Sequence, residues 1–415
     1  MTSGVVSCLP LRILALAETE IVTGPVKNLL NFYRTCRQCE AGAVELAIAP
    51  FERGHPDSVS RPNQLSQAAA ALGVPTYRLQ EHFRFDPRTI LQLRKLVHDI
   101  NPHIIQTHHA KSHVVVQLSR LGKKRPWVAF HHGHTRADFR LRLYEGLDRW
   151  SLRAPTQVVT VSGAFAQQLV GMGVPREKIV VLHNAVELAP ERNFNFEDLQ
   201  AKKARLGISG TERIVLAIGR LSKEKAYPDL VAALAELRRL HPELPVRLII
   251  LGEGPERPAI EAAIRSAGLE RGVSLPGHMR DVSPYYEVAD VFAISSLSEG
   301  SPNVLLEAMA ASVPVVASAV GGIPEIVTDQ QQALLVHPRD PRALADALAG
   351  ILTNRRLAQA LSRAARSLAA TRFSPEQRVR TLIELYSKVY QNWQSNPELS
   401  TMAEIKDKLK VFQRY

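Results

Sequence analysis

The chain has few cysteines and no long apolar run, and each shortage argues against a class of protein. Three cysteines among 415 residues are too few for a disulfide framework, so the composition is typical of a reducing compartment. No stretch approaches the roughly 18 consecutive apolar residues of a membrane-spanning helix. Cys36 and Cys39 form a lone CxxC without a second pair, which argues against a metal or redox site.

Positive charge is concentrated in the first half of the chain. Residues 1–190 hold 23 Lys and Arg against 14 Asp and Glu, for a net +9, whereas the rest hold 29 against 26, for +3 of the total +12. Such an excess predicts an anionic partner for the first half. Basic residues are not interleaved with aromatic ones and no helix-turn-helix pattern occurs, so no nucleic acid is expected. An anionic membrane surface or a polyprenyl-phosphate acceptor remains.

Short apolar runs alternate with amphipathic stretches, a pattern typical of parallel sheets with crossover helices. In the first half the expected strands are Arg12–Ala17, Val44–Ala49, Thr76–Leu79, His103–Thr107, Trp127–His131 and Val158–Val161. In the second half they are Arg213–Ile218, Val246–Leu251, Val273–Leu275, Val291–Ser295, Pro314–Ala317 and Ala333–Val336. The length suits two domains. We therefore expect domains at 1–190 and 191–375, a linker near 184–200, and a helix with a basic tail at 376–415.

Two carboxylates eight residues apart, Glu299 and Glu307, flank the expected start of an apolar helix. Ser301 suits its N-cap and Pro302 its first position. A carboxylate in that helix is costly unless it is hydrogen-bonded, so Glu307 either binds a ligand, pairs with a structural arginine or caps a neighbouring helix. The strand-like run Asp290–Ser295 places the preceding loop at the carboxyl end of a parallel strand, where α/β folds bind ligands.

A second loop, directly after the expected strand Arg213–Ile218, combines a glycine with cations. Arg220 and Lys225 are placed to reach a diphosphate, and Gly219 lets the backbone turn closely beneath it. Basic loop residues are usually solvated, so this loop indicates a phosphate site only in combination with the carboxylate helix.

These motifs, with Gly252-Glu253-Gly254-Pro255, Gly277 and Gly321-Gly322, resemble the C-terminal domain of family 4 (group 1) glycosyltransferases. The resemblance covers roughly residues 12–390 and implies an α/β protein of GT-B fold, with two Rossmann-like domains whose parallel sheets face each other across a cleft. It further implies a retaining, metal-independent enzyme without a cofactor, which moves a sugar from a nucleotide-diphosphate sugar to an acceptor.

The resemblance also implies roles for individual residues. Glu307 would accept hydrogen bonds from the donor ribose, and Glu299 would contact hydroxyls of the transferred sugar. The implied catalytic residues are His108, Arg220, Lys225 and Glu299. The implied donor-binding residues are Gly24, Gly219, Gly300, Ser301, Pro302, Asn303, Val304 and Glu307. The first loop departs from the family, because only Gly24 of its usual paired glycines is present, and Ala226 replaces a glycine after Lys225.

The histidines of the first half leave alternatives open. The segment Gln106–Ser112 resembles the family's histidine beside the transferred sugar, and this role maps to His108, with His109 as the alternative because the two are adjacent. A zinc site at His131-His132-Gly133-His134 is not expected, because no cysteine or acidic ligand lies at a suitable spacing.

The acceptor is expected to be a saccharide or a lipid-linked saccharide of polysaccharide or glycolipid synthesis, met in the cytoplasm or at the cytoplasmic face of the membrane. A basic surface predicts reversible docking on anionic lipid; its cations are Arg120, Lys123, Lys124, Arg125, Arg136, Arg140, Arg142, Arg149 and Arg153. The alternative is that these arginines form ion pairs with Asp138, Glu145 and Asp148. Two other functions fit parts of the pattern: a GT-B sugar-nucleotide epimerase, and a nicotinamide-dependent oxidoreductase, which the missing GxGxxG after the first strand disfavours.

Overall fold

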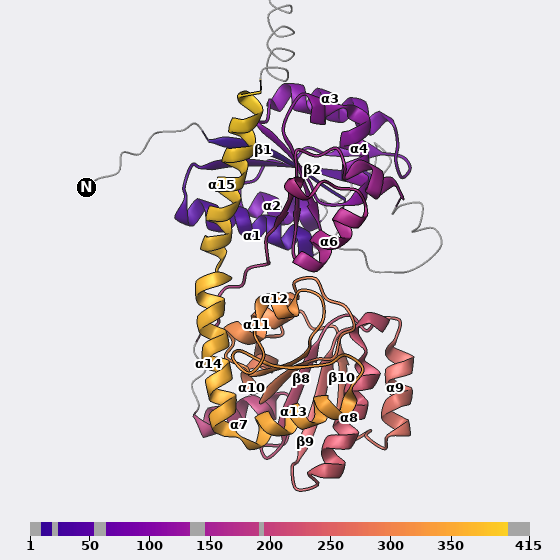
Figure 1. Ribbon diagram of the computed structural model, residues 1–415, viewed down its shortest axis with the longest axis vertical. Coiled ribbons are helices and arrows are strands. Elements are labelled where there is room, and N and C mark those ends of the chain that lie inside the picture. The colour runs from indigo at the N-terminus through magenta and orange to yellow at the C-terminus, as the bar shows by residue number, and fades with distance from the viewer. Residues whose placement is uncertain (1–9, 19–23, 54–63, 133–145, 191–194, 397–415) are drawn as a thin grey trace, which may run out of the picture. The chain divides into compact units, whose positions relative to one another are not determined.

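The chain folds into two compact α/β units. The computed structural model describes residues 10–18, 24–53, 64–132, 146–190 and 195–396. Unit 1 comprises Met1–Val161, Phe165–Leu182 and Pro375–Tyr415, and unit 2 comprises Ser162–Ala164 and His183–Ser374. In each unit, helices cover both faces of a parallel sheet (Figure 1).

Unit 1 is built on a seven-stranded sheet in the order β3-β2-β1-β4-β5-β6-β7, and every pair of neighbours is parallel. The strands are β1 (Leu11–Ala17), β2 (Val44–Arg53), β3 (Leu79–Glu81), β4 (Ile104–Thr107), β5 (Trp127–His131), β6 (Gln157–Thr160) and β7 (Ile179–Val181). The inner strands are apolar on both faces because both faces are covered by helices.

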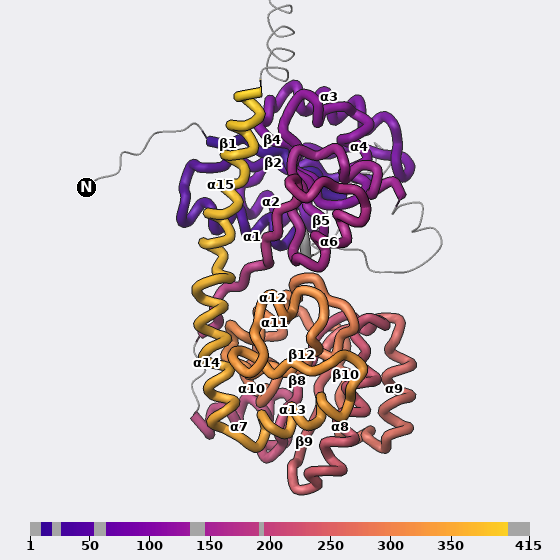
Figure 2. Tube along the Cα trace, in the orientation of Figure 1, coloured from indigo at the N-terminus to yellow at the C-terminus, as the bar shows by residue number. Residues whose placement is uncertain are grey.

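Helices from distant parts of the chain cover this sheet. One face packs against α1 (Gly24–Cys39), α2 (Gln64–Ala71) and α15 (Pro375–Gln394). The other packs against α3 (Arg88–Ile100), α4 (Ala110–Ser119) and α6 (Gly163–Gly171), with the short 3-10 helices η1 (Leu121–Lys123) and η2 (Arg176–Lys178) nearby. The Cα trace shows α15 running beside α1 (Figure 2), where Tyr386 meets Phe32 edge-on with ring centroids 6.1 Å apart.

Unit 2 holds a six-stranded parallel sheet in the order β10-β9-β8-β11-β12-β13. Its strands are β8 (Arg213–Ile218), β9 (Val246–Leu251), β10 (Val273–Gly277), β11 (Val291–Ile294), β12 (Val315–Ser318) and β13 (Leu334–Val336). One face packs against α8 (Tyr227–Leu240), α9 (Arg257–Ser266) and α13 (Pro341–Thr353). The other packs against α7 (Phe196–Arg205), α10 (Ser283–Val288), α11 (Asn303–Ala310), α12 (Ile323–Ile326) and α14 (Arg355–Arg372), and η3 (Lys223–Lys225) precedes α8.

The expected α/β architecture with two parallel sheets is confirmed, with local corrections. The strand expected at Thr76–Leu79 lies at Leu79–Glu81 instead, and Thr76 forms only an isolated bridge to Ile48. Strand β7 was not predicted, because three residues are too few to show a period. In the described part of the chain, no helix combines the length and apolar composition that a membrane span requires.

Each sheet has one place where the connections of two neighbouring strands lead in opposite directions. In unit 1 this place lies between β1 and β4, and in unit 2 between β8 and β11. Open α/β sheets bind ligands at the carboxyl ends of such strand pairs. The topology therefore directs attention to the residues after β1 and β4 in unit 1 and after β8 and β11 in unit 2.

Candidate functional site

The loops after β8 and β11 are joined at the predicted place in unit 2. The Ser295 hydroxyl donates to the backbone oxygen of Lys225 at 2.8 Å, and the Leu297 N–H donates to the backbone oxygen of Glu224 at 2.7 Å. The predicted cations and carboxylates, which are some 75 residues apart in sequence, thereby share one edge of the sheet.

Two further loops, after β9 and β12, contact the loops after β8 and β11 closely because they contain glycines. Gly252, after β9, has φ +141°, and a Cβ there would lie 1.9 Å from the backbone oxygen of Gly219. Gly321, after β12, has φ +55°, and a Cβ there would lie 1.8 Å from the backbone oxygen of Glu299. Only glycine fits such contacts, and this explains why glycine occupies these positions in the motifs that resemble the family.

Lys225 and Glu299 form the central contact of the unit 2 site. The Lys225 ammonium lies 2.6 Å from Glu299 Oε1, which also accepts a 2.6 Å hydrogen bond from the Ser296 hydroxyl. The Glu299 side chain is only 8% exposed, so this pair is largely shielded from water. Its Oε2 has no hydrogen-bond partner among the described residues. One carboxylate oxygen and the remaining ammonium protons are thus available to a ligand.

Arg220 stands apart from this pair. Its side chain is exposed, and no ion pair ties it to another described residue. A Cβ at Gly219, before it, would lie 2.8 Å from the Tyr227 hydroxyl, so a larger residue would require the Tyr227 side chain to shift. The arrangement leaves a long, unanchored cation beside an anchored one, Lys225, on the same loop, and both charges are available to a diphosphate.

The helix after this loop begins one residue later than predicted. Its N-cap is Pro302 and not Ser301, and no side chain caps it. The Ser301 hydroxyl instead accepts a hydrogen bond from the Asn184 N–H at 3.2 Å, while the Asn184 amide donates to the Ser301 backbone oxygen at 2.8 Å. Asn303 is the first helical residue, and its buried Oδ1 has no partner among the described residues. The helix therefore starts without a cap, next to the backbone N–H groups of Gly300, Ser301, Asn303 and Val304.

Glu307 is half-buried and has a partner that the sequence did not reveal. The Tyr286 hydroxyl, from α10, lies 3.2 Å from Glu307 Oε2 and 3.2 Å from the Val304 backbone oxygen. Burial, together with the Glu307 charge, raises the pKa of Tyr286 well above its usual 10, so Tyr286 stays a hydrogen-bond donor. Neither the predicted arginine nor a helix cap holds this carboxylate, and its Oε1 has no partner among the described residues.

In unit 1 the predicted histidine lies in a buried hydrogen-bonded chain. The Tyr386 hydroxyl of α15 donates to Gln106 Oε1 at 2.8 Å, and Gln106 Nε2 lies 2.7 Å from His108 Nε2. With the amide in that orientation, His108 Nε2 accepts and the ring proton sits on Nδ1, which faces His132 Nε2 at 3.4 Å. Burial lowers the pKa of His108 well below 6.5, so the ring is neutral.

The alternative histidine, His109, differs from its neighbour. Its Nδ1 is buried without a hydrogen-bond partner among the described residues, and burial lowers its pKa to about 4. The hydroxyl of Ser112 accepts hydrogen bonds from the backbone N–H groups of His108 and His109 at 3.2 and 3.1 Å. This contact fixes both histidines at the start of α4.

The remaining predicted features divide between described and undescribed residues. Gly24 is the first residue of α1, directly after residues 19–23, which lie outside the described ranges. His134, Arg136, Arg140, Arg142 and most of the basic tail also lie outside them. Within the described ranges, no three His, Cys, Asp or Glu side chains are arranged to hold a metal ion. Burial raises the pKa of the Cys36 thiol to about 11.

Of the three acidic residues that could pair with the arginines of this surface, only Asp148 lies within the described ranges. Asp148 is buried and lies 2.7 Å from His113 Nδ1, and its pairing with an arginine of this surface stays a prediction. Arg149 and Arg153 instead donate to backbone oxygens at the end of α6.

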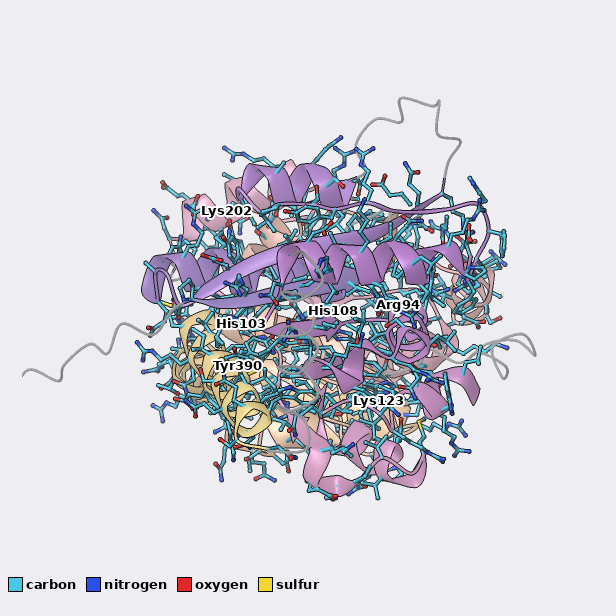
Figure 3. The ribbon with its side chains drawn as sticks, turned by 90° about the horizontal axis from the view of Figure 1, so that it is seen from above. Arg94, His103, His108, Lys123, Lys202 and Tyr390 are labelled. Atoms are coloured by element: carbon cyan, nitrogen blue, oxygen red, sulfur yellow. The ribbon has the colours of Figure 1, made fainter. Side chains whose placement is uncertain are left out.

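Exposed cations lie on the other edge of the unit 1 sheet. Lys123 and Lys124 precede β5 and so lie at the amino ends of the strands, whereas His108 follows β4. Figure 3 labels Arg94 and Lys123 to one side of His108, and it shows His103 beside Tyr390, whose rings stack 4.7 Å apart.

Comparisons with known families agree with this geometry. Residues 37–189 match the model of Glycosyltransferase Family 4, and residues 212–354 match the model of Glycosyl transferases group 1. The two models therefore cover the greater part of units 1 and 2, respectively.

Curated relatives differ in how much they share. A D-inositol 3-phosphate glycosyltransferase of Corynebacterium urealyticum is 35% identical over 44% of this chain and 44% of its own length. An N-acetyl-alpha-D-glucosaminyl L-malate synthase of Bacillus anthracis is 24% identical over 76% of this chain and 82% of its own. The chain thus spans less than half the length of several curated relatives that it matches.

Solved structures share the fold. HepE of Anabaena in complex with UDP has a TM-score of 0.76 at 19% identity, over 91% of this chain and all of HepE. The sucrose-phosphate synthase of Thermosynechococcus elongatus has a TM-score of 0.69 at 21% identity, over 92% of this chain and all of the synthase. The expected GT-B fold is confirmed by these neighbours.

Proposed function

We propose that this chain, which belongs to the group 1 (family 4) glycosyltransferases, transfers a sugar from a nucleotide-diphosphate sugar to an acceptor. The observation that carries the proposal is the Lys225–Glu299 pair. It places a cation and a free carboxylate oxygen together at the carboxyl ends of β8 and β11, where the connections of the sheet diverge. A diphosphate needs the cation, and sugar hydroxyls need the carboxylate. The bound UDP in the structure of HepE, a fold neighbour, is consistent with a nucleotide donor.

The donor would lie along the carboxyl edge of unit 2. Arg220 and Lys225 would hold its diphosphate, and the N–H groups at the start of α11 would face the same negative charge. Glu299 Oε2 would accept hydrogen bonds from the transferred sugar. Glu307 Oε1 would accept from the ribose hydroxyls, while Tyr286 holds Glu307 Oε2 in place. No metal and no cofactor is assigned to this site.

The reaction would retain the configuration of the sugar. The bond from the anomeric carbon to the diphosphate oxygen breaks, and the acceptor oxygen bonds to the same face of that carbon. The acceptor proton passes to the departing diphosphate oxygen, and Arg220 and Lys225 stabilise its negative charge. Two buried carboxylates of unit 1 favour this front-face route over a covalent one, because Glu81 is bound to Lys111 and Asp148 to His113.

The acceptor side is assigned to unit 1. His108, or His109 in the alternative, would adjoin the transferred sugar.

We further propose that the acceptor is a lipid-linked saccharide and that the protein attaches reversibly to the cytoplasmic face of an anionic membrane. Exposed Leu91 and Leu118 lie on α3 and α4, the helices that carry Arg94 and precede Lys123. Lys123 and Lys124 lie at the amino edge of the sheet, so docking through them would tether the protein without forming the acceptor site.

A thermal-shift panel of UDP-, GDP- and ADP-sugars tests the donor assignment. A ligand that binds only the folded state raises the melting temperature, so one of these donors should do so while the free sugars do not. Failure of every nucleotide sugar to shift the melting temperature would remove the proposed function.

Metal independence and stereochemistry need separate measurements. Turnover with the selected donor should survive EDTA, because Arg220 and Lys225 meet the phosphate charge; a strict requirement for added magnesium or manganese would refute this. Proton NMR of the product should show the anomeric configuration of the donor, and the opposite configuration would refute retention.

A further inference from the structure

Unit 1 carries a second group of charged residues that the roles proposed so far do not use. Arg53 ends β2, Glu81 ends β3, Glu18 follows β1, and Lys111 lies in the first turn of the helix after β4. The strands β3, β2, β1 and β4 are consecutive neighbours in the sheet, so these side chains share its carboxyl edge. Lys111 is three residues after His108, which places the group beside the candidate reaction centre of this unit.

The centre of the group is a buried ion pair. The Lys111 and Glu81 side chains are 1% and 4% exposed, and the Lys111 ammonium contacts Glu81 Oε2 directly. The ammonium also lies 4.3 Å from the centroid of the Phe51 ring. A buried ion pair stabilises a fold little compared with apolar packing, because both charges lose their water. Its place at a ligand-binding edge therefore favours a role in holding something else.

The Lys111–Glu81 pair fixes the position of the Arg53 side chain. Its Nε donates to Glu81 Oε1 at 3.0 Å, the oxygen that Lys111 leaves free. The Arg53 side chain is 48% exposed, and its two terminal nitrogens make no hydrogen bond to a described residue. A guanidinium anchored in this way presents a planar pair of N–H groups to solvent, a geometry that matches two oxygens of a phosphate.

The local charge favours an anion. Arg53, Lys111 and Glu81 together carry one net positive charge, and the Arg84–Glu18 pair, 3.3 Å apart, adds none. Burial raises the pKa of Glu18, and Glu81 raises it further, against the opposing effects of Arg84, Lys111 and Arg53.

We propose that Arg53, positioned by Glu81 and Lys111, binds a phosphate monoester carried by the acceptor. This inference rests on the proposed function, since it makes the carboxyl edge of unit 1 the acceptor side of a transfer reaction. It names the acceptor class as a phosphorylated one, and the phosphate belongs either to a soluble molecule or to a lipid headgroup. The ion pair contributes by fixing the guanidinium before the acceptor arrives, which lowers the entropic cost of binding.

Binding of inorganic phosphate to the full chain tests the proposal. All proteins carry Arg220→Ala, so that the proposed donor site in unit 2 contributes little to phosphate binding. Calorimetric titration should show that adding Arg53→Gln weakens phosphate binding by about tenfold or more, as expected for loss of charged hydrogen bonds. The matched control is Arg78→Gln, because Arg78 is 43% exposed and also pairs with a carboxylate of β2, Glu52, at 3.3 Å. This control should bind phosphate as before.

Equal phosphate binding with and without Arg53→Gln would overturn the proposal, and so would the absence of any phosphate binding. Melting curves establish that each variant is folded. A second arm uses vesicles of phosphatidylcholine with and without phosphatidic acid, and all proteins in it carry Lys123→Glu and Lys124→Glu so that the proposed docking surface contributes little. Loss of phosphatidic acid binding in Arg53→Gln assigns the phosphate to a lipid headgroup, and unchanged binding assigns it to a soluble acceptor. Nucleotide-sugar binding in a background with Arg220 intact is unaffected by Arg53, so failure here is distinct from failure of the proposed function.

Discussion

Lys225 and Glu299 determine each other's position in the proposed donor site. The ammonium neutralises the carboxylate, and the Ser296 hydroxyl holds the same carboxylate oxygen. An incoming diphosphate would therefore meet a cation that is already ordered, whereas exposed Arg220 has to be ordered by the ligand itself. The two cations of one loop consequently make different contributions to stability.

Arg220→Ala and Lys225→Ala are each predicted to reduce turnover by on the order of 100-fold, since each removes a charge that stabilises the leaving diphosphate. Arg220→Ala should leave the melting temperature unchanged, because the side chain is exposed. Lys225→Ala should lower it, because Glu299 would remain largely buried without its partner. Initial rates and melting curves of both variants decide this. Wild-type turnover in either variant contradicts the assignment.

The sequence pointed to the residues that are proposed to contact the ligand, but not to the residues that hold them in place. Glu307 and Lys225 could be predicted because a carboxylate in an apolar helix and a cation after a glycine are unusual in themselves. Tyr286 and Tyr386 could not, because an isolated tyrosine in an amphipathic segment is ordinary. Tyr386 meets Gln106 across 280 residues of sequence, and only the packing of α15 on unit 1 creates that contact.

At the scale of elements, the site depends on loops that approach one another more closely than side chains allow. The turn after β12 is the clearest case, because Gly321 combines a positive φ with contact to the Glu299 backbone. Any side chain at Gly321 would push on the loop that carries Glu299. Gly350, inside α13, provides a contrast, because a Cβ added there would meet no atom within 4 Å.

Gly321→Ala is predicted to destabilise unit 2 by about 1–3 kcal/mol and to weaken nucleotide-sugar binding, because the backbone of Glu299 must shift. Gly350→Ala should stabilise by about 0.5–1 kcal/mol, since alanine favours a helix and meets open space. Denaturant unfolding and donor titration of both variants measure these effects. Equal behaviour of the two variants would show that the contact at Gly321 does not matter.

The helix start that the sequence did not predict correctly has a cause in the tertiary structure. Ser301 is a good N-cap residue, yet the helix begins after Pro302 because the Ser301 hydroxyl is bonded to Asn184. That partner lies 117 residues away and is supplied only by the folded unit. The parallel direction of the strands, in contrast, follows from the alternation of apolar runs and amphipathic stretches, which is why the parallel sheets could be predicted.

The histidines after β4 and β5 make unit 1 sensitive to acid. Burial lowers the pKa of His109 to about 4 and those of His108 and His132 well below 6.5. In the unfolded chain these groups titrate near 6.5, so the unfolded state binds more protons below that pH. Stability is fully present above about pH 6.5 and falls as the pH drops towards 4, by at most about 1.4 kcal/mol per pH unit per histidine.

His109→Gln is accordingly predicted to reduce the loss of stability between pH 7 and 5, because glutamine does not titrate. Melting temperatures of wild type and variant at both pH values measure it. An identical decrease in the two proteins would mean that His109 is not neutral in the folded state.

At the scale of the whole molecule, the two units divide the proposed chemistry. Unit 2 supplies a cation, carboxylates and an uncapped helix start, which suit a nucleotide-diphosphate sugar. Unit 1 supplies neutral histidines and a cationic edge, which suit an acceptor of opposite charge. The net +9 of residues 1–190 agrees with this division, because the excess charge lies where the acceptor and the membrane are expected.

Wild-type protein is predicted to co-sediment with anionic vesicles at low salt and to be released at high salt. Each cation near such a surface contributes about 1 kcal/mol, so Lys123→Glu with Lys124→Glu should abolish most binding. The control is Arg265→Glu with Arg271→Glu, which makes the same charge change on exposed residues of unit 2. No binding of wild type at low salt, or equal loss in both double variants, would remove membrane docking through this surface.

The central claim is that Glu307 belongs to a nucleotide-sugar site, and calorimetric titration of the selected donor into wild type and Glu307→Gln tests it most directly. The carboxylate has one oxygen held by Tyr286 and one left for a ligand. Glu307→Gln should therefore bind the donor about tenfold or more weakly, with an unchanged melting temperature, since hydrogen bonds to a charged group are lost. Equal affinity of Glu307→Gln and wild type for the donor would contradict the account.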